Sequence, residues 1–339
     1  MRRMFVIFVF VFFVSSCTNE DDSIENNNSK NDWIIDEKDV SGDFFLYPLA
    51  LNPKFDNVSS IDLNDGQLVG IVNFGFQTIV YPYIYTFDNE VINAEYNGRK
   101  YAFTYCPITK SAIAFSRTQI FRASGYLYKE NLTPWDEETE SIWSQMLIKG
   151  IKGENRNKRF NTIPVLETTW GAAKSFFPNA KVLAGSPSYN KSFSSSSFKF
   201  NSSPPDYDGD NDNLDIEKPN PSEHVYGIID NFSNVHIFRH IDFKNKIVVK
   251  TISNQEYIII GNQSKRFFNA FKVDNALDYQ VLDIDELPYV IKDKRGIKYN
   301  ILGVGTNGGV LEKPKYAYVA AWWAWEDFYS NFSFVNNAE

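Results

Sequence analysis

The sequence predicts a mainly β protein, a β-rich α+β fold in which two duplicated units of about 150 residues are each closed by a short aromatic helix. Apolar runs rich in Val, Ile, Tyr and Phe are short, and Asn, Asp, Gly or Pro interrupts them about every ten residues. This spacing is typical of many short strands. In the first unit the strand candidates are residues 67–74, 78–87, 100–106 and 111–115, and Asn97-Gly98 predicts a hairpin turn.

Similar segments recur in the same order in the two halves of the chain. The segment LVGIV at 68–72 returns as VYGII at 225–229, and the aromatic segment 170–177 returns as 322–329. Both aromatic segments repeat their rings at helical spacing, so they are the best helix candidates. Anchors that keep one order at a similar offset favour a duplicated unit, and chance matching between strand-rich segments is the alternative.

These patterns divide the chain into five parts. A polar stretch follows the N-terminal apolar run, and a segment rich in Ser and Pro separates the two units. The parts are a signal peptide at 1–16, a lipidated tether at 17–32, a first unit at 33–185, a linker or insertion at 186–222, and a second unit at 223–339.

The N-terminus has the pattern of an export signal. Arg2 and Arg3 precede an apolar run that ends at Ser15-Ser16-Cys17. Small residues before a cysteine resemble a bacterial lipobox, which would place a lipid on Cys17 and anchor the protein in a membrane. An acidic cluster at 20–22 resembles the surface-export signal of Bacteroidetes lipoproteins. We therefore expect a cell-envelope protein at the outer membrane or cell surface, with an ordinary secretory signal or N-terminal anchor as the alternative.

The net charge indicates which classes of partner the protein can bind. The chain has 34 Lys and Arg against 42 Asp and Glu, a formal net charge of −8, and no long basic run. Such a surface is unsuited to a phosphate backbone, so we expect no nucleic-acid partner. The expected partners are the membrane, through the lipid on Cys17, and an unknown small molecule or protein.

The stretch 104–145 concentrates the residues that could carry chemistry. Cys106 ends a predicted strand and, with Cys17 acylated, has no partner for an intramolecular disulfide. It is either a buried structural cysteine or a reactive thiol or metal ligand, with Arg117 among the nearest cations. Asp136 opens an acidic run that could act in acid–base catalysis or bind a cation, and a solvated turn explains the run equally well.

A second acidic segment has the spacing of a calcium loop. Five carboxylates occupy positions 1, 3, 5, 7 and 12 of an EF-hand-type pattern, namely Asp206, Asp208, Asp210, Asp212 and Glu217. Asn211 replaces the usual glycine, and prolines flank the segment where helices would be expected. Calcium is thus the one candidate cofactor, and a solvated acidic loop is the alternative.

Four segments carry a resemblance to a known family. They read TYCPIT, ASGYLYKENLTPWDEETESIWSQM, PVLETTW followed by FFPNAKVL, and AWWAWEDFY. Together they resemble the bacterial and archaeal family catalogued as domain of unknown function 3179, over roughly residues 36–334. The resemblance implies a map of important positions and no reaction. Those positions are Glu90, Asn93, Cys106, Pro107, Thr109, Arg117, Ser124, Gly125, Leu127, Tyr128, Asn131, Leu132, Asp136, Thr139, Ser141, Trp143, Ser144, Gln145 and Trp170.

The chain departs from that family pattern at five positions. Asp88-Asn89 stands where relatives commonly have Trp-His, and Ala94 stands where an Asp is usual. Lys110 replaces a usual Gly, and Glu137 replaces a usual Arg. If the family has a reaction that needs the missing His and Asp, this member has lost it.

We therefore predict a ligand-binding or interaction module with a polar and aromatic pocket in the first unit. The alternative is an enzyme, or an inactive descendant of one, that uses Cys106 as nucleophile or metal ligand, with Arg117 and Asp136 as further catalytic candidates. The predicted binding residues are Glu90, Asn93, Thr109, Ser124, Tyr128, Asn131, Ser141, Trp143 and Gln145.

Overall fold

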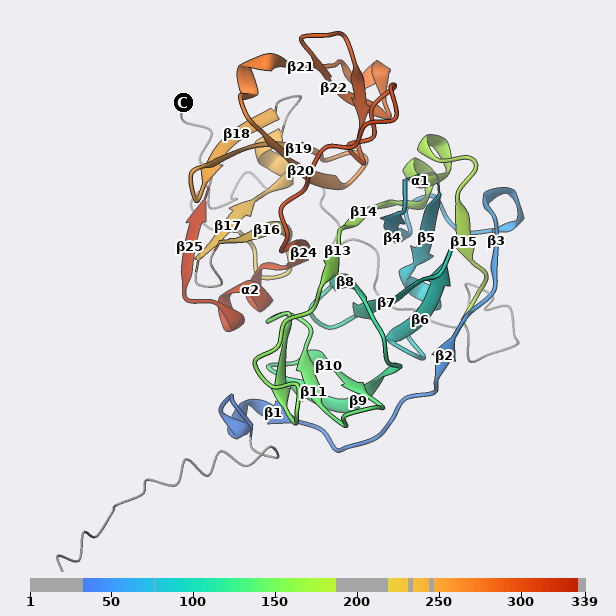
Figure 1. Cartoon of the computed structure of the whole chain (residues 1–339), viewed down its shortest axis with the longest axis vertical. Coiled ribbons are helices and arrows are strands. Elements are labelled where there is room, and N and C mark those ends of the chain that lie inside the picture. The colour runs from blue at the N-terminus through green and yellow to red at the C-terminus, as the bar shows by residue number, and fades with distance from the viewer. Residues whose placement is uncertain (1–32, 76, 187–218, 231–233, 244–246, 335–339) are drawn as a thin grey trace, which may run out of the picture.

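A computed structural model describes residues 33–75, 77–186, 219–230, 234–243 and 247–334 of the chain. The predicted signal peptide, the lipidated tether and the predicted calcium loop lie outside these residues. Within them the protein is mainly β, as predicted, with six sheets and two short α-helices (Figure 1).

Three sheets belong to the first half. One has the order β14-β4-β5-β15-β3, and α1 (Trp170–Phe176) connects β14 to β15. Its strands are β3 (Phe55–Asn57), β4 (Leu68–Asn73), β5 (Thr78–Pro82), β14 (Val165–Thr169) and β15 (Lys181–Leu183). The second sheet contains β2 (Ala50–Leu51), β6 (Val91–Tyr96), β7 (Arg99–Cys106), β8 (Ser111–Ser116) and β13 (Thr162–Ile163). The third contains β1 (Val40–Ser41), β9 (Phe121–Tyr128), β10 (Asn131–Asp136), β11 (Ile142–Ser144) and β12 (Lys149–Lys152).

Three further sheets belong to the second half. The order β24-β16-β17-β25 contains α2 (Trp322–Phe328) between its outer strands β24 and β25. Its strands are β16 (His224–Asp230), β17 (Asn234–Phe238), β24 (Ala317–Ala321) and β25 (Asn331–Phe334). The other two sheets contain β18 (Ile247–Ile252), β19 (Gln255–Asn262) and β20 (Phe267–Val273), and β21 (Tyr279–Val281), β22 (Tyr289–Asp293) and β23 (Lys298–Asn300).

The two halves use the same order of strand pairing. In each, a hairpin (β4–β5 or β16–β17) is flanked on one side by a strand that leads into the helix and on the other by the strand that follows it. The strand after the helix runs parallel to its neighbour in both cases. Three consecutive strands then pair in another sheet in each half, β6–β7–β8 with β2 and β13 at the edges in the first half and β18–β19–β20 alone in the second. A duplicated unit would produce this arrangement.

Local sequence signals explain where the elements begin and end. Asn97 and Gly98 both have left-handed φ values, 49° and 77°, as the tight turn between β6 and β7 requires. The side chain of Thr169 accepts a hydrogen bond from the backbone N–H of Ala172 and caps α1. The strand predicted at 78–87 ends earlier, at Pro82, because a 3₁₀ turn, η3 (Tyr83–Tyr85), follows it.

The alternation of side chains along β7 separates two cores. Tyr101, Phe103 and Tyr105 face the sheet that contains β4 and β5. Ala102 and Cys106 face the opposite way, into a cluster shared with the second half. Polar side chains on this second face of β7 must therefore find their partners inside the protein.

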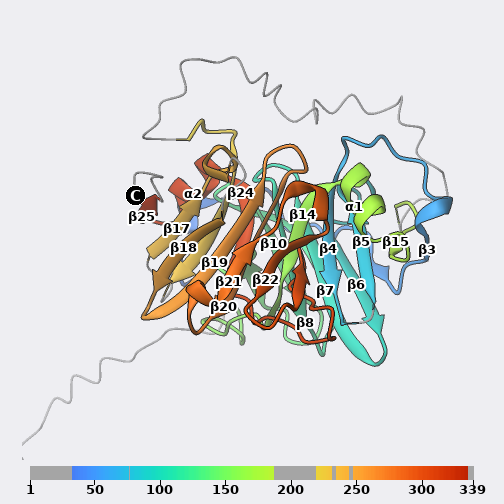
Figure 2. The ribbon, with the colours of Figure 1, turned by 90° about the horizontal axis from the view of Figure 1, so that it is seen from above.

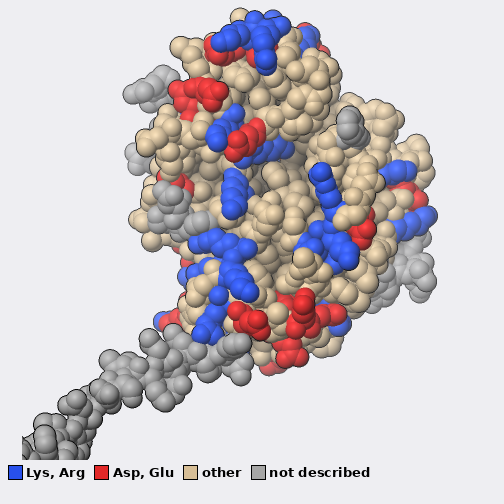
Figure 3. All heavy atoms as spheres, viewed as in Figure 1, with Lys and Arg blue, Asp and Glu red and all other residues tan. Residues whose placement is uncertain are grey.

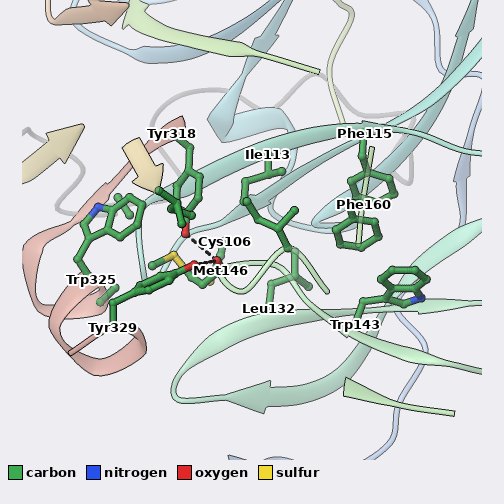
Figure 4. Close-up of a cluster of buried hydrophobic side chains, with 14 of the residues drawn as sticks. Cys106, Ile113, Phe115, Leu132, Trp143, Met146, Phe160, Tyr318, Trp325 and Tyr329 are labelled. Carbon is green, nitrogen blue, oxygen red and sulfur yellow. Dashed lines mark hydrogen bonds between the residues drawn. The ribbon is translucent and has the colours of Figure 1, made fainter. Parts of the chain in front are cut away.

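The two halves pack against each other rather than standing apart (Figures 1 and 2). The hydroxyls of Tyr318 and Tyr329 both donate to the carbonyl of Met146, at 2.7 and 2.9 Å (Figure 4). The backbone N–H of Ala321 donates to the carbonyl of Thr109 at 2.9 Å. Residues predicted as a first-unit site thus lie next to the second half.

Candidate functional site

Gln145 is the centre of a buried hydrogen-bond network in the first half. Its Oε1 accepts from Ser111 Oγ at 2.7 Å and from Asn131 Nδ2 at 2.9 Å. Its Nε2 donates to Thr104 Oγ1 at 2.8 Å and to the carbonyl of Ser111 at 3.3 Å. Asn131 also donates to Thr109 Oγ1 at 2.8 Å. All five side chains are buried, and the amide of Gln145 has no unused donor or acceptor.

The second half has an apolar interior at the corresponding positions. The last residue pair of the β7–β8 hairpin is Cys106–Ser111, and the last pair of β19–β20 is Asn262–Phe267. Counting back two residues along each strand pairs Thr104 with Ile260. Phe267 and Ile260 are buried hydrophobic residues of one core cluster. The strand pairing therefore forms with apolar residues at these two positions, although Asn269, opposite Ile260, is buried and donates to the carbonyl of Ile301 at 2.7 Å. The fold thus does not require the particular polar residues of the Gln145 network.

The carboxylate of Asp136 is surrounded by hydrogen-bond donors of the protein. Its carboxylate accepts from the N–H and hydroxyl of Thr139 at 2.8 and 2.6 Å, from the indole of Trp143 at 2.8 Å and from Asn155 at 3.2 Å. The hydroxyl of Ser141 interacts with Thr139 at 2.7 Å and accepts from the N–H of Asn155 at 2.9 Å. These bonds order the turn between β10 and β11, which agrees with the turn interpretation of the acidic run.

Two other predicted residues, Arg117 and Asn93, hold strands and loops together. Arg117 donates to the carbonyls of Tyr101 and Gln119 at 3.1 and 3.2 Å. Asn93 donates to the carbonyls of Ala50 and Phe121 and accepts from the N–H of Phe121.

Ser124 bonds to Thr133, and Tyr128 packs edge-on against Phe328. The predicted site residues are thus spread over several networks. A small pocket between the halves, lined by Ile113, Val165, Lys315 and Tyr318 among others, contains none of them.

Cys106 lies in the shared core beside Met146 and Leu132 (Figure 4). Its side chain is 1% exposed, and its Sγ contacts the carbonyl of Glu130 at 3.9 Å. Burial, and then the charge of Glu90, raise the pKa of the thiol. The protonated, buried form favours the structural interpretation of this cysteine.

Glu90 differs from the other predicted residues. Its φ is 56°, and its backbone donates to the carbonyl of Thr86 and accepts from the N–H of Tyr105. Among the described residues, no side chain or backbone group forms a hydrogen bond or ion pair with its carboxyl group. Burial raises the pKa of Glu90 to about 7. Burial, and next the charge of Glu90, raise the pKa of Tyr47, as they do for Cys106.

The departures from the family pattern have local explanations. Asn89 is buried and donates to the carbonyl of Pro48 at 2.6 Å, so it ties the segment before β2 to the loop that carries Glu90. Lys110 has a φ of 57°, a conformation that a glycine adopts without strain. Ala94 is buried in an apolar cluster, where an aspartate would need a partner.

Sequence reasoning missed a buried pair between the halves. Glu167 Oε1 lies 3.0 Å from His224 Nδ1, and both side chains are 4% exposed. The available signal was a charged residue inside the segment VLETT, which forms β14, since such a residue needs a buried partner. Over the described ranges, no group of three His, Cys, Asp or Glu side chains has the geometry of a metal site.

The Gln145 network gives a testable consequence. Gln145→Glu places a carboxylate oxygen against the acceptors Thr104 Oγ1 and Ser111 O, so we expect a loss of about 3 kcal/mol or more in the free energy of unfolding. Denaturant unfolding at pH 7 measures it. The matched control is Gln280→Glu, because Gln280 is exposed. Equal stability of the two variants would contradict the buried network.

Comparison with known proteins places the chain in a family. The sequence model described as "Protein of unknown function (DUF3179)" matches residues 47–332, which is more than half of the chain. No curated protein and no solved structure matches the chain. The match covers all the described strands from β2 to β24 and the residues that carried the resemblance. The chain is therefore a member of the DUF3179 family of proteins of unknown function.

Proposed function

We propose that the protein is a lipid-anchored, extracytoplasmic binding module whose first half holds a small ligand at Glu90. One observation carries the proposal. Of the charged side chains among the predicted site residues that the structure describes, Glu90 alone has no hydrogen bond or ion pair. Its neighbours are the phenol of Tyr47 and the thiol of Cys106, which lie close enough for the carboxylate charge to affect their pKa values. A ligand with a hydroxyl or amino group would supply the donor that the carboxyl lacks.

The energetic setting of Glu90 supports this proposal. A left-handed φ at a non-glycine residue costs of order 1 kcal/mol. Burial of an ionisable carboxyl without a partner is also unfavourable, which is why its pKa is raised. Groups held at such a disadvantage are concentrated at functional sites. The buried hydrogen bonds of Asn93 and Gln145 involve β6 and β7, the strands next to Glu90, and hold the backbone there in place.

The other parts of the proposal rest on the sequence. The charged start, the apolar run and the residues before Cys17 support export and lipid attachment. The shared order of strand pairing supports a duplication, after which the first half kept polar residues that the second half lacks. The structure's described residues contain no helix that is long and apolar enough to span a membrane.

Glu90→Gln should change the pH dependence of stability. The folded protein raises the pKa of Glu90 from 4.5 to about 7, so the fold prefers the protonated carboxyl. Wild-type stability should therefore fall as the pH rises through this window, by up to about 3 kcal/mol. The Gln side chain cannot ionise, so the variant should not lose stability as the pH rises. It should therefore melt at a higher temperature than wild type at pH 8 and at a similar temperature at pH 4.5. A melting-temperature difference that does not vary with pH would contradict the raised pKa of Glu90.

A ligand screen tests the binding role directly. Wild type, Glu90→Gln and Glu95→Gln are compared by thermal shift against a panel of amino acids, amines and sugars at pH 7. Glu95 lies on β6, the strand that begins directly after Glu90, and is exposed, so it is the matched control. We expect at least one compound to stabilise wild type and Glu95→Gln but not Glu90→Gln. Compounds that stabilise all three proteins equally would speak against a site at Glu90.

Cys17→Ser tests the anchor. The variant should leave the membrane fraction and appear in the soluble fraction, because the acyl chains supply the membrane affinity. Fractionation followed by immunoblotting measures the distribution, with Cys106→Ser as the control. Membrane retention of Cys17→Ser would refute lipid anchoring at this residue.

The second candidate function is an enzyme that uses Cys106. It is favoured because the charge of Glu90, whose pKa is about 7, acts on the thiol of Cys106. Alkylation by iodoacetamide and peptide mapping distinguish the two functions. For the binding module we expect Cys106 to remain unlabelled in the native protein and to react after unfolding. Labelling of native Cys106 at a rate that falls in Glu90→Gln would favour the enzyme.

A further inference from the structure

The segment that connects β1 to β2 keeps large apolar side chains exposed. Phe44 and Phe45 are 49% and 65% exposed, and Leu49 and Leu51 are 41% and 42% exposed. Among the described residues nine large hydrophobic side chains are exposed, and these four lie within eight consecutive positions. Exposed apolar surface is unfavourable in water, and contiguous patches of it mark sites of protein or membrane interaction. The segment runs along the outer edge of the molecule (Figure 1).

The backbone of this segment is fixed against β9. The N–H of Phe45 donates to the carbonyl of Ser124 at 2.8 Å. Gly125, with a φ of 81°, lets the two chains approach this closely, because a Cβ at that position would lie 2.5 Å from the carbonyl oxygen of Asp43. The fold therefore holds Phe44 and Phe45 at the surface, since the backbone that carries them cannot turn their rings inward.

Aromatic rings from other elements extend the exposed pair into one surface. The centre of the Phe44 ring lies 5.9 Å from that of Tyr126 on β9 and 6.1 Å from that of Trp135 on β10. Trp33 packs edge-on against Tyr126 with 5.8 Å between the ring centres. The last three rings are half-buried. Together the five residues form the aromatic edge of the protein, namely Trp33, Phe44, Phe45, Tyr126 and Trp135.

Charged side chains of both signs border the aromatic edge. Lys152 Nζ lies 4.5 Å from the centre of the Trp33 ring. Arg122, which pairs with Trp135 across β9 and β10, faces Glu137 at 3.9 Å. The space-filling view shows acidic and basic side chains at the end of the molecule where β1 and β9 lie (Figure 3). An anionic membrane surface attracts polybasic segments, whereas a border of mixed charge suits zwitterionic headgroups.

The position of Trp33 in the chain indicates which surface covers the aromatic edge. Trp33 lies 16 residues after Cys17, the residue that carries the lipid in the proposed function. Sixteen residues span at most about 55 Å, so the anchored protein stays close to the bilayer. Tryptophan and tyrosine favour the membrane interface, because the ring is apolar and its N–H or O–H stays in contact with water.

We propose that the aromatic edge rests in the interfacial layer of the phospholipid bilayer that holds the lipid on Cys17, against zwitterionic headgroups. The inference rests on the lipid anchor of the proposed function. The anchor keeps the aromatic edge at a high local concentration near the bilayer, so a weak contact is sufficient. The aromatic edge then fixes the orientation of the protein, with β1 and β9 toward the membrane and with β21 and β22 at the opposite end (Figure 1).

Quenching of tryptophan fluorescence by brominated lipid tests the contact. The acylated protein is reconstituted into phosphatidylcholine vesicles with or without bromine on the acyl chains, because bromine quenches an indole only at short range. We expect brominated vesicles to lower the emission of wild type. Trp33→Phe combined with Trp135→Phe should lose most of this quenching, whereas Trp323→Phe, a change at a half-buried tryptophan of α2, should keep it. The other tryptophans are buried, namely Trp143, Trp170, Trp322 and Trp325.

Replacement of the two exposed phenylalanines separates the contact from the anchor. Phe44→Ser combined with Phe45→Ser should sediment with the vesicles like wild type, because the acyl chains remain, and should lose most of the quenching. The matched control is Leu277→Ser, which removes a side chain that is 92% exposed in the second half and should be quenched like wild type. Circular dichroism checks the fold, and Phe45→Ser alone replaces the double variant if that protein is unfolded.

Sedimentation with the vesicles distinguishes failure of the contact from failure of the anchor. Wild type that sediments without being quenched, or a double variant that is quenched like wild type, overturns the proposal and leaves the anchor intact. Wild type that does not sediment refutes the anchor, and the inference fails with it. A wild-type dimer that the double variant converts to a monomer would assign the aromatic edge to a second copy of the chain and would also overturn the proposal.

Discussion

Pairing of buried polar groups is the constraint on which the interior of this protein depends. The sheets pack so closely that Thr104, Ser111, Asn131 and Gln145 are completely buried, and each finds its partner among the others or on the backbone. A network of this kind is stable only when every member is satisfied. It therefore specifies how β7, β8 and β10 sit relative to one another, and it holds Cys106 and the loop of Thr109 in place against the second half.

The contrast between the two halves separates architecture from function. Both halves form the same strand pairings, yet Ile260 and Phe267 replace the polar Thr104 and Ser111. Asp136 and Asp293, in contrast, are alike in the two halves. Each ends a strand and accepts hydrogen bonds from the turn that follows. The aspartates thus belong to the architecture, whereas the polar core around Gln145 is a special feature of the first half.

Much of the fold follows from local patterns, and the site does not. The aromatic segments at 170–177 and 322–329 form the two helices, and Asn97-Gly98 forms its hairpin, because these features depend on neighbouring residues. The predicted pocket residues form a group only because they lie close in sequence. The alternation of strands directs their side chains to different faces, so Arg117 and Asp136 take part in separate networks.

The sequence by itself determined the mainly β class, the turn and helix positions and the membership of a family, since periodicity, turn residues and long motifs are local properties of a chain. Only the tertiary structure decided which polar groups are paired. Glu167 and His224 are 57 residues apart on strands of different sheets, and their contact depends on how the two halves pack. The structure likewise shows that the amide of Gln145 is fully paired, whereas the carboxyl group of Glu90 has no partner within the described residues. Hydrogen-bond partners are fixed by the packing of distant strands rather than by neighbours in the sequence.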